Sequence, residues 1–145
     1  MLNDNLKVTG DVVVTITGPD GQIKDKREIK NLVVATGKAF IAGRMVGTPD
    51  VMTHMAIGAG NSAAASGDTT LNSELGRAVL TAAGADGPVV TYTSTFAPGT
   101  GTGAVVEAGI FNAGAAGTML CRTVFAVVNK GADDAMSITW AITVS

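Results

Sequence analysis

The chain has 145 residues, a net charge of −2 at pH 7, a pI of about 5.2 and only 15% charged residues. Binding to a nucleic-acid backbone needs clustered Lys and Arg, and base stacking needs aromatic side chains, which make up 4% of this chain, so we expect no nucleic-acid partner. The sequence has no apolar run near the roughly 20 residues of a membrane span, so we expect no membrane partner either, and the length predicts one domain over residues 1–145.

The N-terminal part of the chain predicts an arm followed by two strands. We expect residues 1–5 to form an N-terminal arm or the start of an edge strand. Residues 6–17 (LKVTGDVVVTIT) are predicted to form a strand that ends at the turn Gly18-Pro19-Asp20-Gly21. The return strand, residues 22–30 (QIKDKREIK), is the most charged segment, as is typical of a solvent-facing edge. A docking patch for an acidic partner is the alternative interpretation of this strand.

A single helix is predicted over residues 31–46 (NLVVATGKAFIAGRMV), where apolar side chains recur at helical spacing. Gly37 and Gly43 are unfavourable inside a helix, and Pro49 ends it. We expect this helix to cover one open end of the β core.

The middle of the chain predicts three further strands and a long loop. The strands are residues 51–58 (VMTHMAIG), 77–83 and 89–96 (VVTYTSTF). Residues 59–69 (AGNSAAASGDT) form a loop of small residues, and residues 70–76 are expected to make a single helical turn.

The last third predicts an antiparallel meander of three strands, residues 104–112, 118–128 and 136–144, separated by clusters of Gly, Asn and Asp. Large or apolar residues alternate with small polar ones along the final strand, which places one set on the core face. That set is Met136, Ile138, Trp140, Ile142 and Val144.

About eight strands and one short helix, with turns at this spacing, are typical of a sandwich or a barrel. We expect an all-β fold, namely an antiparallel two-sheet sandwich that is jelly-roll-like. The order of the strands does not follow from the sequence.

The motifs of catalysis and cofactor binding are weak in this chain. Residues 58–63 (GAGNSA) match a nucleotide-binding glycine pattern, but no helix start follows them, so an ordinary loop is expected. His54 is the only histidine, and the lone Cys121 is expected to be a core residue. Glycan cleavage would need paired carboxylates in a cleft, for which only Glu74 and Glu107 are candidates. We therefore expect no enzymatic activity, cofactor or metal.

Glu107 lies in an otherwise small and apolar segment, and a buried carboxylate needs a partner. Arg44, Arg77 and Arg122 occur in similarly apolar surroundings. We expect a structural ion pair, with Arg77 as the first choice of partner. Interface positions are expected at Leu2, Leu6, Val51, Met52 and His54.

Eight stretches between residues 31 and 144 form a familiar combination: Asn31-Leu32-Val33-Val34, Gly37-Lys38, Ile41-Ala42, Met55-Ala56-Ile57-Gly58, Asp68-Thr69-Thr70-Leu71, Glu74-Leu75-Gly76-Arg77, Glu107-Ala108-Gly109-Ile110-Phe111 and Trp140-Ala141-Ile142-Thr143-Val144. Together these stretches resemble small virion proteins of tailed bacteriophages, and most closely capsid decoration, or cement, proteins.

The resemblance implies a structural virion protein that is made in the cytoplasm of a bacterial host. Such a protein binds the outer surface of the capsid at contacts between capsomers and stabilises the shell. Its expected partners are the major capsid protein and further copies of itself, as a homodimer or homotrimer. The alternative implied by related sequences is a tail-fibre or baseplate module involved in host receptor binding.

Overall fold

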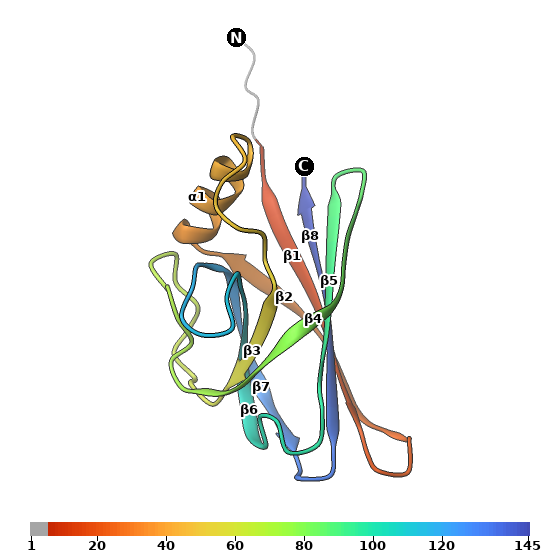
Figure 1. Ribbon diagram of the computed structural model, residues 1–145. Coiled ribbons are helices and arrows are strands. Elements are labelled where there is room, and N and C mark those ends of the chain that lie inside the picture. The colour runs from red at the N-terminus through yellow and green to blue at the C-terminus, as the bar shows by residue number, and fades with distance from the viewer. Residues whose placement is uncertain (1–5) are drawn as a thin grey trace.

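The computed structural model describes residues 6–145, so the expected N-terminal arm at residues 1–5 lies outside the described residues. The chain forms strands throughout, with one helix after the second strand (Figure 1). The elements are β1 (Val8–Thr17), β2 (Ile23–Val33), α1 (Ala35–Arg44), β3 (His54–Gly58), β4 (Glu74–Asp86), β5 (Val89–Phe96), β6 (Gly103–Phe111), β7 (Met119–Lys130) and β8 (Ala135–Val144).

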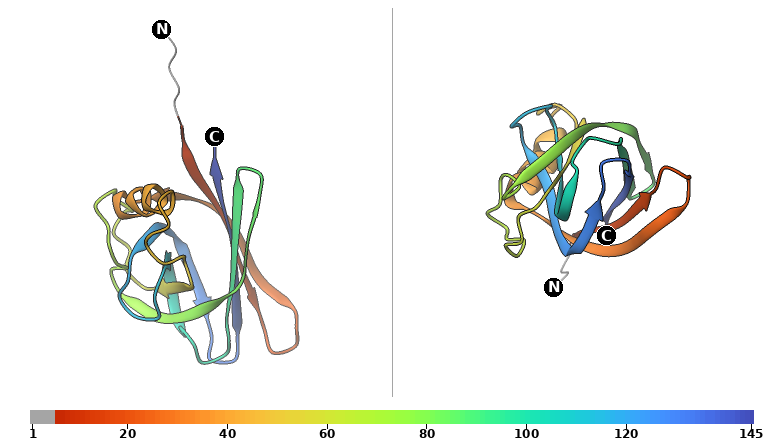
Figure 2. Two further views of the ribbon diagram at one scale, coloured as in Figure 1. Left: turned by 45° about the horizontal axis from the view of Figure 1, so that its top comes forward. Right: turned by 90° about the horizontal axis from the view of Figure 1, so that it is seen from below.

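The eight strands close into an antiparallel β-barrel with the order β1-β2-β7-β6-β3-β4-β5-β8. The expectation of an all-β chain with eight strands and one short helix is confirmed. The expectation of a two-sheet sandwich, and of a jelly roll in particular, is wrong. Figure 2 shows the ring of strands from below.

Two strands that change partner along their length close the barrel. The first part of β4 pairs with β3 as far as Val79, and residues 80–86 pair with β5 after a register shift between Leu80 and Ala82. Similarly, β2 pairs with β1 up to Asn31 and then with β7 through Leu32 and Val33. Strands that turn a corner in this way join what would otherwise be two separate sheets. The alternation of apolar residues does not reveal which strands do so, which is why the sequence suggested a sandwich.

The barrel interior is filled by alternate residues of the strands. Met136, Ile138 and Trp140 of β8 are fully buried and Ile142 is nearly so, which confirms the core face predicted for this strand. Trp140 lies opposite Val12 of β1 on one side and Tyr92 of β5 on the other. A large indole at this position fills the space between neighbouring strands.

Helix α1 is shorter than predicted because residues 31–33 complete β2. It begins after Val34 without a side-chain cap, and Phe40 is buried on its inner face. The hydroxyl of Thr36 donates a hydrogen bond of 2.8 Å to the carbonyl of Met119, which ties the first turn to β7. Figure 1 shows the helix beside the end of the barrel at which β1 begins.

The turn between β7 and β8 holds a carboxylate, Asp134, whose contacts favour its charged form. Oδ2 of Asp134 accepts a hydrogen bond of 2.9 Å from the N–H of Gly131, and the ammonium of Lys24 lies 3.1 Å away. Both contacts lower the pKa of Asp134 below its ordinary value of 3.8, and the hydrogen bond from Gly131 has the largest effect. A carboxyl whose native pKa is depressed binds fewer protons in the native state than in the unfolded chain.

We therefore expect the stabilisation from Asp134 to be complete at neutral pH and to be lost as the pH falls below about 4 and through the native pKa. Urea unfolding from pH 7 to pH 2.5 should show a steeper loss of stability for the native protein than for Asp134→Asn. The Asp133→Asn variant removes the same charge from the exposed neighbour and serves as the control. Identical pH profiles for native protein and Asp134→Asn would contradict this assignment.

Candidate functional site

The connection from β3 to β4, residues 59–73, is the longest irregular segment among the described residues. It follows the left side of the molecule in Figure 1 as a yellow-green trace. The helical turn expected at residues 70–76 does not form, because Glu74 already begins β4. Irregular connections longer than about 12 residues are uncommon in small domains and are usually either functional or disordered. The contacts between this connection and the barrel show whether it is ordered.

Glu107 of β6 binds both ends of this connection. Its side chain is fully buried. Oε2 accepts hydrogen bonds from the N–H groups of Gly60 at 2.7 Å and Ser73 at 2.8 Å, and Oε1 accepts one from the N–H of Asn72 at 2.9 Å. One carboxylate therefore replaces the pairing that these three backbone groups would find in a regular strand.

Arg122 of β7 completes the cluster and is also fully buried. Its Nε donates to Oε1 of Glu107 at 3.1 Å, and its Nη1 donates to Oδ2 of Asp68 at 2.9 Å. Its Nη2 donates to the carbonyl of Ser62 at 3.0 Å and to Oδ1 of Asn72 at 2.6 Å. Each of the three guanidinium nitrogens is thus used, and two carboxylates face one cation.

The expected partner of Glu107 was Arg77, and this assignment is corrected by the structure, which pairs Glu107 with Arg122. Strand β7 lies directly beside β6, and the register places Arg122 opposite Gly109, two residues along β6 from Glu107. Arg77 lies on β4, on the far side of β3. There it pairs with Glu74 at 2.7 Å.

Arg77 has a separate structural role. Its guanidinium carbon lies 4.0 Å from the centre of the Phe111 ring, a cation–π contact, and its Nη1 donates to the carbonyls of Ala113 and Ala116. The third candidate, Arg44, donates to the carbonyl of Pro49 at 2.8 Å, beyond the end of α1.

Apolar contacts outside the barrel wall also hold the connection. A second buried apolar cluster, separate from the barrel core, consists of Val34, Ala56, Leu71, Phe111 and Met119. Leu71 comes from the connection itself and is only 6% exposed. The connection therefore covers the outer face of β3, β6 and β7, which explains why β6 is buried on both faces.

The glycine pattern at residues 58–63 serves this packing. A Cβ atom at Gly58 or at Gly60 would lie 2.6 Å from Oε2 of Glu107. Both glycines are needed so that the backbone approaches the carboxylate closely. The pattern singled out in the sequence as a nucleotide-binding motif thus has a structural explanation.

The expected interface residues are divided by the structure. Leu6 is 77% exposed and Val51 is 53% exposed, whereas Met52 is 3% exposed and belongs to the core. Met52 is therefore corrected from an interface position to a packing position. His54 is half-buried at the start of β3, with Nδ1 2.8 Å from the hydroxyl of Thr53. Leu2 lies outside the described residues.

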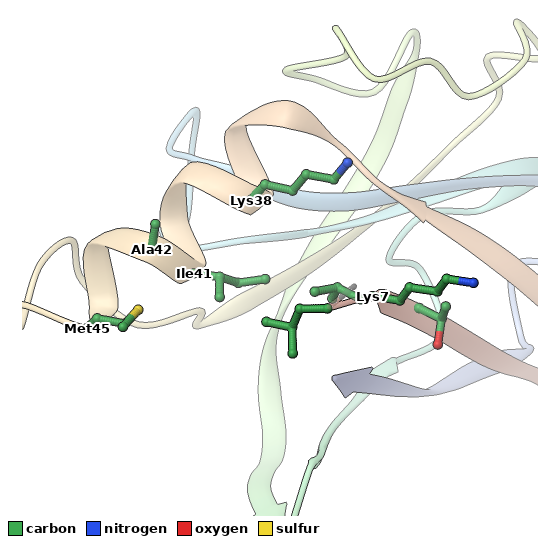
Figure 3. A pocket seen from close by; sticks show the side chains of 8 residues that line it. Lys7, Lys38, Ile41, Ala42 and Met45 are labelled. Atoms are coloured by element: carbon green, nitrogen blue, oxygen red, sulfur yellow. The ribbon is translucent and has the colours of Figure 1, made fainter. Parts of the chain in front are cut away.

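An open groove of about 590 Å³ lies between α1 and the first residues of β1. Ile41 and Ala42 of α1, and Met45 at its C-terminal cap, face Leu6 and Val8 across it, and Lys7 and Lys38 also line it. Figure 3 shows the helical side chains on one side and those of the strand on the other. The lining is mainly apolar and carries no carboxylate.

The buried side chains also include a nucleophilic group, the thiol of Cys121, and a basic group, the ammonium of Lys130. Burial raises the pKa of the Cys121 thiol well above its ordinary value, so this cysteine behaves as a core residue, as the sequence suggested. Burial also lowers the pKa of Lys130, whose ammonium donates to the carbonyl of Ala97 at 3.0 Å. Within residues 6–145 we find no group of three or more His, Cys, Asp or Glu side chains placed to hold a metal ion.

Comparison with protein-family models, with curated proteins and with solved structures gives no match. Over the described part of the chain, no helix is long and apolar enough to cross a membrane. The features that bear on function are therefore the anchored connection and the resemblance seen in the sequence.

Proposed function

We propose that this protein is a non-enzymatic structural component of a tailed-bacteriophage particle. It binds the outer surface of the capsid at contacts between capsomers, with the major capsid protein as its partner, and it stabilises the shell. The observation that carries the proposal is the anchored connection, residues 59–73, whose exposed surface of small residues is held by buried charged groups.

The anchoring supports a binding role for the connection. A surface that binds a repeated, rigid partner loses less entropy when its loops are ordered beforehand. Glu107 of β6 and Arg122 of β7 provide that order from the outer face of the barrel, and small side chains let the loop backbone come close to a partner. Many weak copies on a symmetric shell then give retention through avidity.

The stretches on which the phage resemblance depends meet at this site. Asp68 and Glu107 bind Arg122, Leu71 and Phe111 belong to the second apolar cluster, and Arg77 lies over Phe111. Residues that are distant in the sequence and that support the resemblance thus build one structural unit. This convergence favours a role for the unit in the proposed binding.

The test is to mix the purified protein with capsids that lack it and to measure occupancy by cryo-electron microscopy. We expect ordered density at regular positions on the shell. The Ala63→Arg/Gly67→Lys variant changes two exposed positions of the connection, and a Cβ atom at Gly67 meets nothing within 4 Å, so its fold should be retained. Its occupancy should fall at least about tenfold, the equivalent of roughly 1.4 kcal/mol.

The matched control is Thr91→Lys/Thr95→Lys, which adds the same charge to two exposed positions of β5. Its occupancy should equal that of the native protein. Density on tails with bare shells would favour the tail-fibre or baseplate alternative. Normal occupancy of the loop variant would show that another surface makes the contact.

A further inference from the structure

The two strands that change partner each leave one edge without a neighbouring strand. After Val79, the side of β4 that faces away from β5 pairs with no strand of the described residues. In the same way, the side of β2 that faces away from β1 is paired only at Leu32 and Val33. Free edges present unpaired N–H and C=O groups and invite pairing with another chain.

The free edge of β2 is protected. Its residues 24–28 are Lys, Asp, Lys, Arg and Glu, and charges on an edge discourage pairing. Arg27 also bends across to β7, where its guanidinium donates to the carbonyls of Ala126 and Val127 at 3.2 Å each. The side chain of Arg27 therefore bridges this edge of β2 to β7.

The free edge of β4 has no such protection. Residues 81–85 read Thr-Ala-Ala-Gly-Ala, carry no charge and are all exposed. The free edge begins beyond the N-terminal end of β3, at the hydrogen bond of 2.8 Å from the N–H of Leu80 to the carbonyl of Thr53. Figure 1 shows the β4–β5 hairpin projecting from the barrel at the upper right.

Exposed apolar side chains lie near the start of this edge. Val79 is 61% exposed on β4, and Val51, which is 53% exposed, lies two residues before Thr53. A strand that paired with β4 beyond the end of β3 would lie close to both of these valine side chains.

We propose that the free edge of β4 pairs antiparallel with the same edge of a second copy of this chain, about a two-fold axis that passes near Gly84. Such an axis is perpendicular to the sheet, so small residues face small residues across it. Asp86 then lies opposite an uncharged residue and not opposite its own copy. The partner's turn at Gly87 and Pro88 comes toward Val79, which gives that side chain a cover. This inference is independent of the proposed function.

Self-pairing depends on register at the β2 edge and does not at the β4 edge. Like charges directly opposite each other destabilise a strand pair. A two-fold pairing of β2 edges centred on residues 26–27 opposes Lys26 to Arg27 and Asp25 to Glu28, whereas one centred on residues 27–28 opposes Arg27 to Glu28. Residues 81–85 of β4 carry no charge, so they meet no such repulsion in any register.

Charge-swapped variants test the pairing. The positive variant is Ala82→Lys/Gly84→Lys/Asp86→Lys, and the negative variant is Ala82→Glu/Gly84→Glu, which keeps Asp86. These residues alternate along β4 on the outer face of the sheet, and a Cβ atom at Gly84 meets nothing within 4 Å. Circular dichroism and thermal melting establish that each variant is folded. Thr91→Lys/Thr95→Lys, one strand away from the edge, is the control.

Molar mass is measured by analytical ultracentrifugation from roughly 1 μM to roughly 1 mM, the range of weak and transient interfaces. We expect the native protein and the control to move from 14.5 kDa toward twice that mass as concentration rises. Each charged variant alone should stay monomeric, and an equal mixture of the two should form a dimer. A native protein that is monomeric throughout, or charged variants that associate as the native protein does, would overturn the proposal.

Discussion

Replacing Arg122 with alanine is expected to lower the free energy of unfolding by about 3–5 kcal/mol, the usual cost of removing one partner of a buried ion pair. The substitution leaves the buried carboxylate of Glu107 without its cation and removes the guanidinium contacts to Asp68, Ser62 and Asn72. At about 2–4 °C per kcal/mol for a chain of this size, the melting temperature should fall by roughly 10 °C. Urea unfolding and thermal melting by circular dichroism measure both quantities.

Lys30→Ala is the matched control, because the Lys30–Asp11 pair lies on the surface, with the side chain of Lys30 87% exposed. An exposed pair contributes about 0–1 kcal/mol. Glu107→Gln should be destabilising as well, since the amide cannot accept from all the donors that the carboxylate binds. An Arg122→Ala variant as stable as the control would mean that the cluster does not hold the connection.

Replacing Gly37 with alanine is expected to destabilise the protein by about 1–3 kcal/mol, the range for overpacking a tight contact. The Cβ atom would lie 1.8 Å from the carbonyl oxygen of Leu120, so α1 would have to move away from β7. The opposite effect is expected at a solvent-exposed position of a helix, where replacing glycine with alanine stabilises the protein by about 1 kcal/mol. A loss of stability therefore indicates that Gly37 is in tight contact. Chemical denaturation with a fluorescence or circular dichroism readout measures the difference.

Gly67→Ala is the control for this substitution, since the added Cβ atom at Gly67 meets nothing within 4 Å. It should be neutral or slightly stabilising, by less than about 1 kcal/mol, through the lower entropy of the unfolded chain. A Gly37→Ala variant that is more stable than the native protein would show that α1 is free to shift on the barrel.

The two proposed surfaces lie on different sides of the barrel. Figures 1 and 2 place the connection of residues 59–73 and the β4–β5 hairpin on opposite sides of the molecule. Pairing through β4 would therefore leave the connection of each copy accessible. A dimer of this kind would present two connections at once, which raises the retention on a surface with repeated sites.

The predicted strands agree closely with the observed strands wherever the signal is local. The strand predicted at residues 89–96 is β5, Val89–Phe96, and the alternation at residues 136–144 identified the core face of β8. The turn predicted at Gly18-Pro19-Asp20-Gly21 lies between β1 and β2. Strand propensity, alternation and turn chemistry depend on a few neighbouring residues, so they can be recognised in a single sequence.

The partner of Glu107 could not be predicted from the residues around it in the sequence. Its apolar surroundings were sufficient to predict burial and the need for a cation, both of which the structure confirms. The choice between Arg77 and Arg122 depends on which strand lies beside β6, and this is set by the order of strands around the barrel. The anchoring of residues 59–73 was missed for the same reason, since Gly60, Asn72 and Ser73 meet Glu107 only in the folded chain. The glycines at positions 58 and 60 are the sequence signal that could have indicated this anchoring.

By itself, the sequence determined that this protein is an all-β chain with one short helix, where most of its strands lie, which face of β8 is buried and that Glu107 needs a partner. Only the tertiary structure decided that the strands close into a barrel, that Arg122 is that partner and that the edge of β4 is left open. The physical reason is that strand pairing joins residues far apart in the chain. Strands β2 and β4 change neighbours partway along, at positions set by the packing of the whole barrel and not by the residues around them.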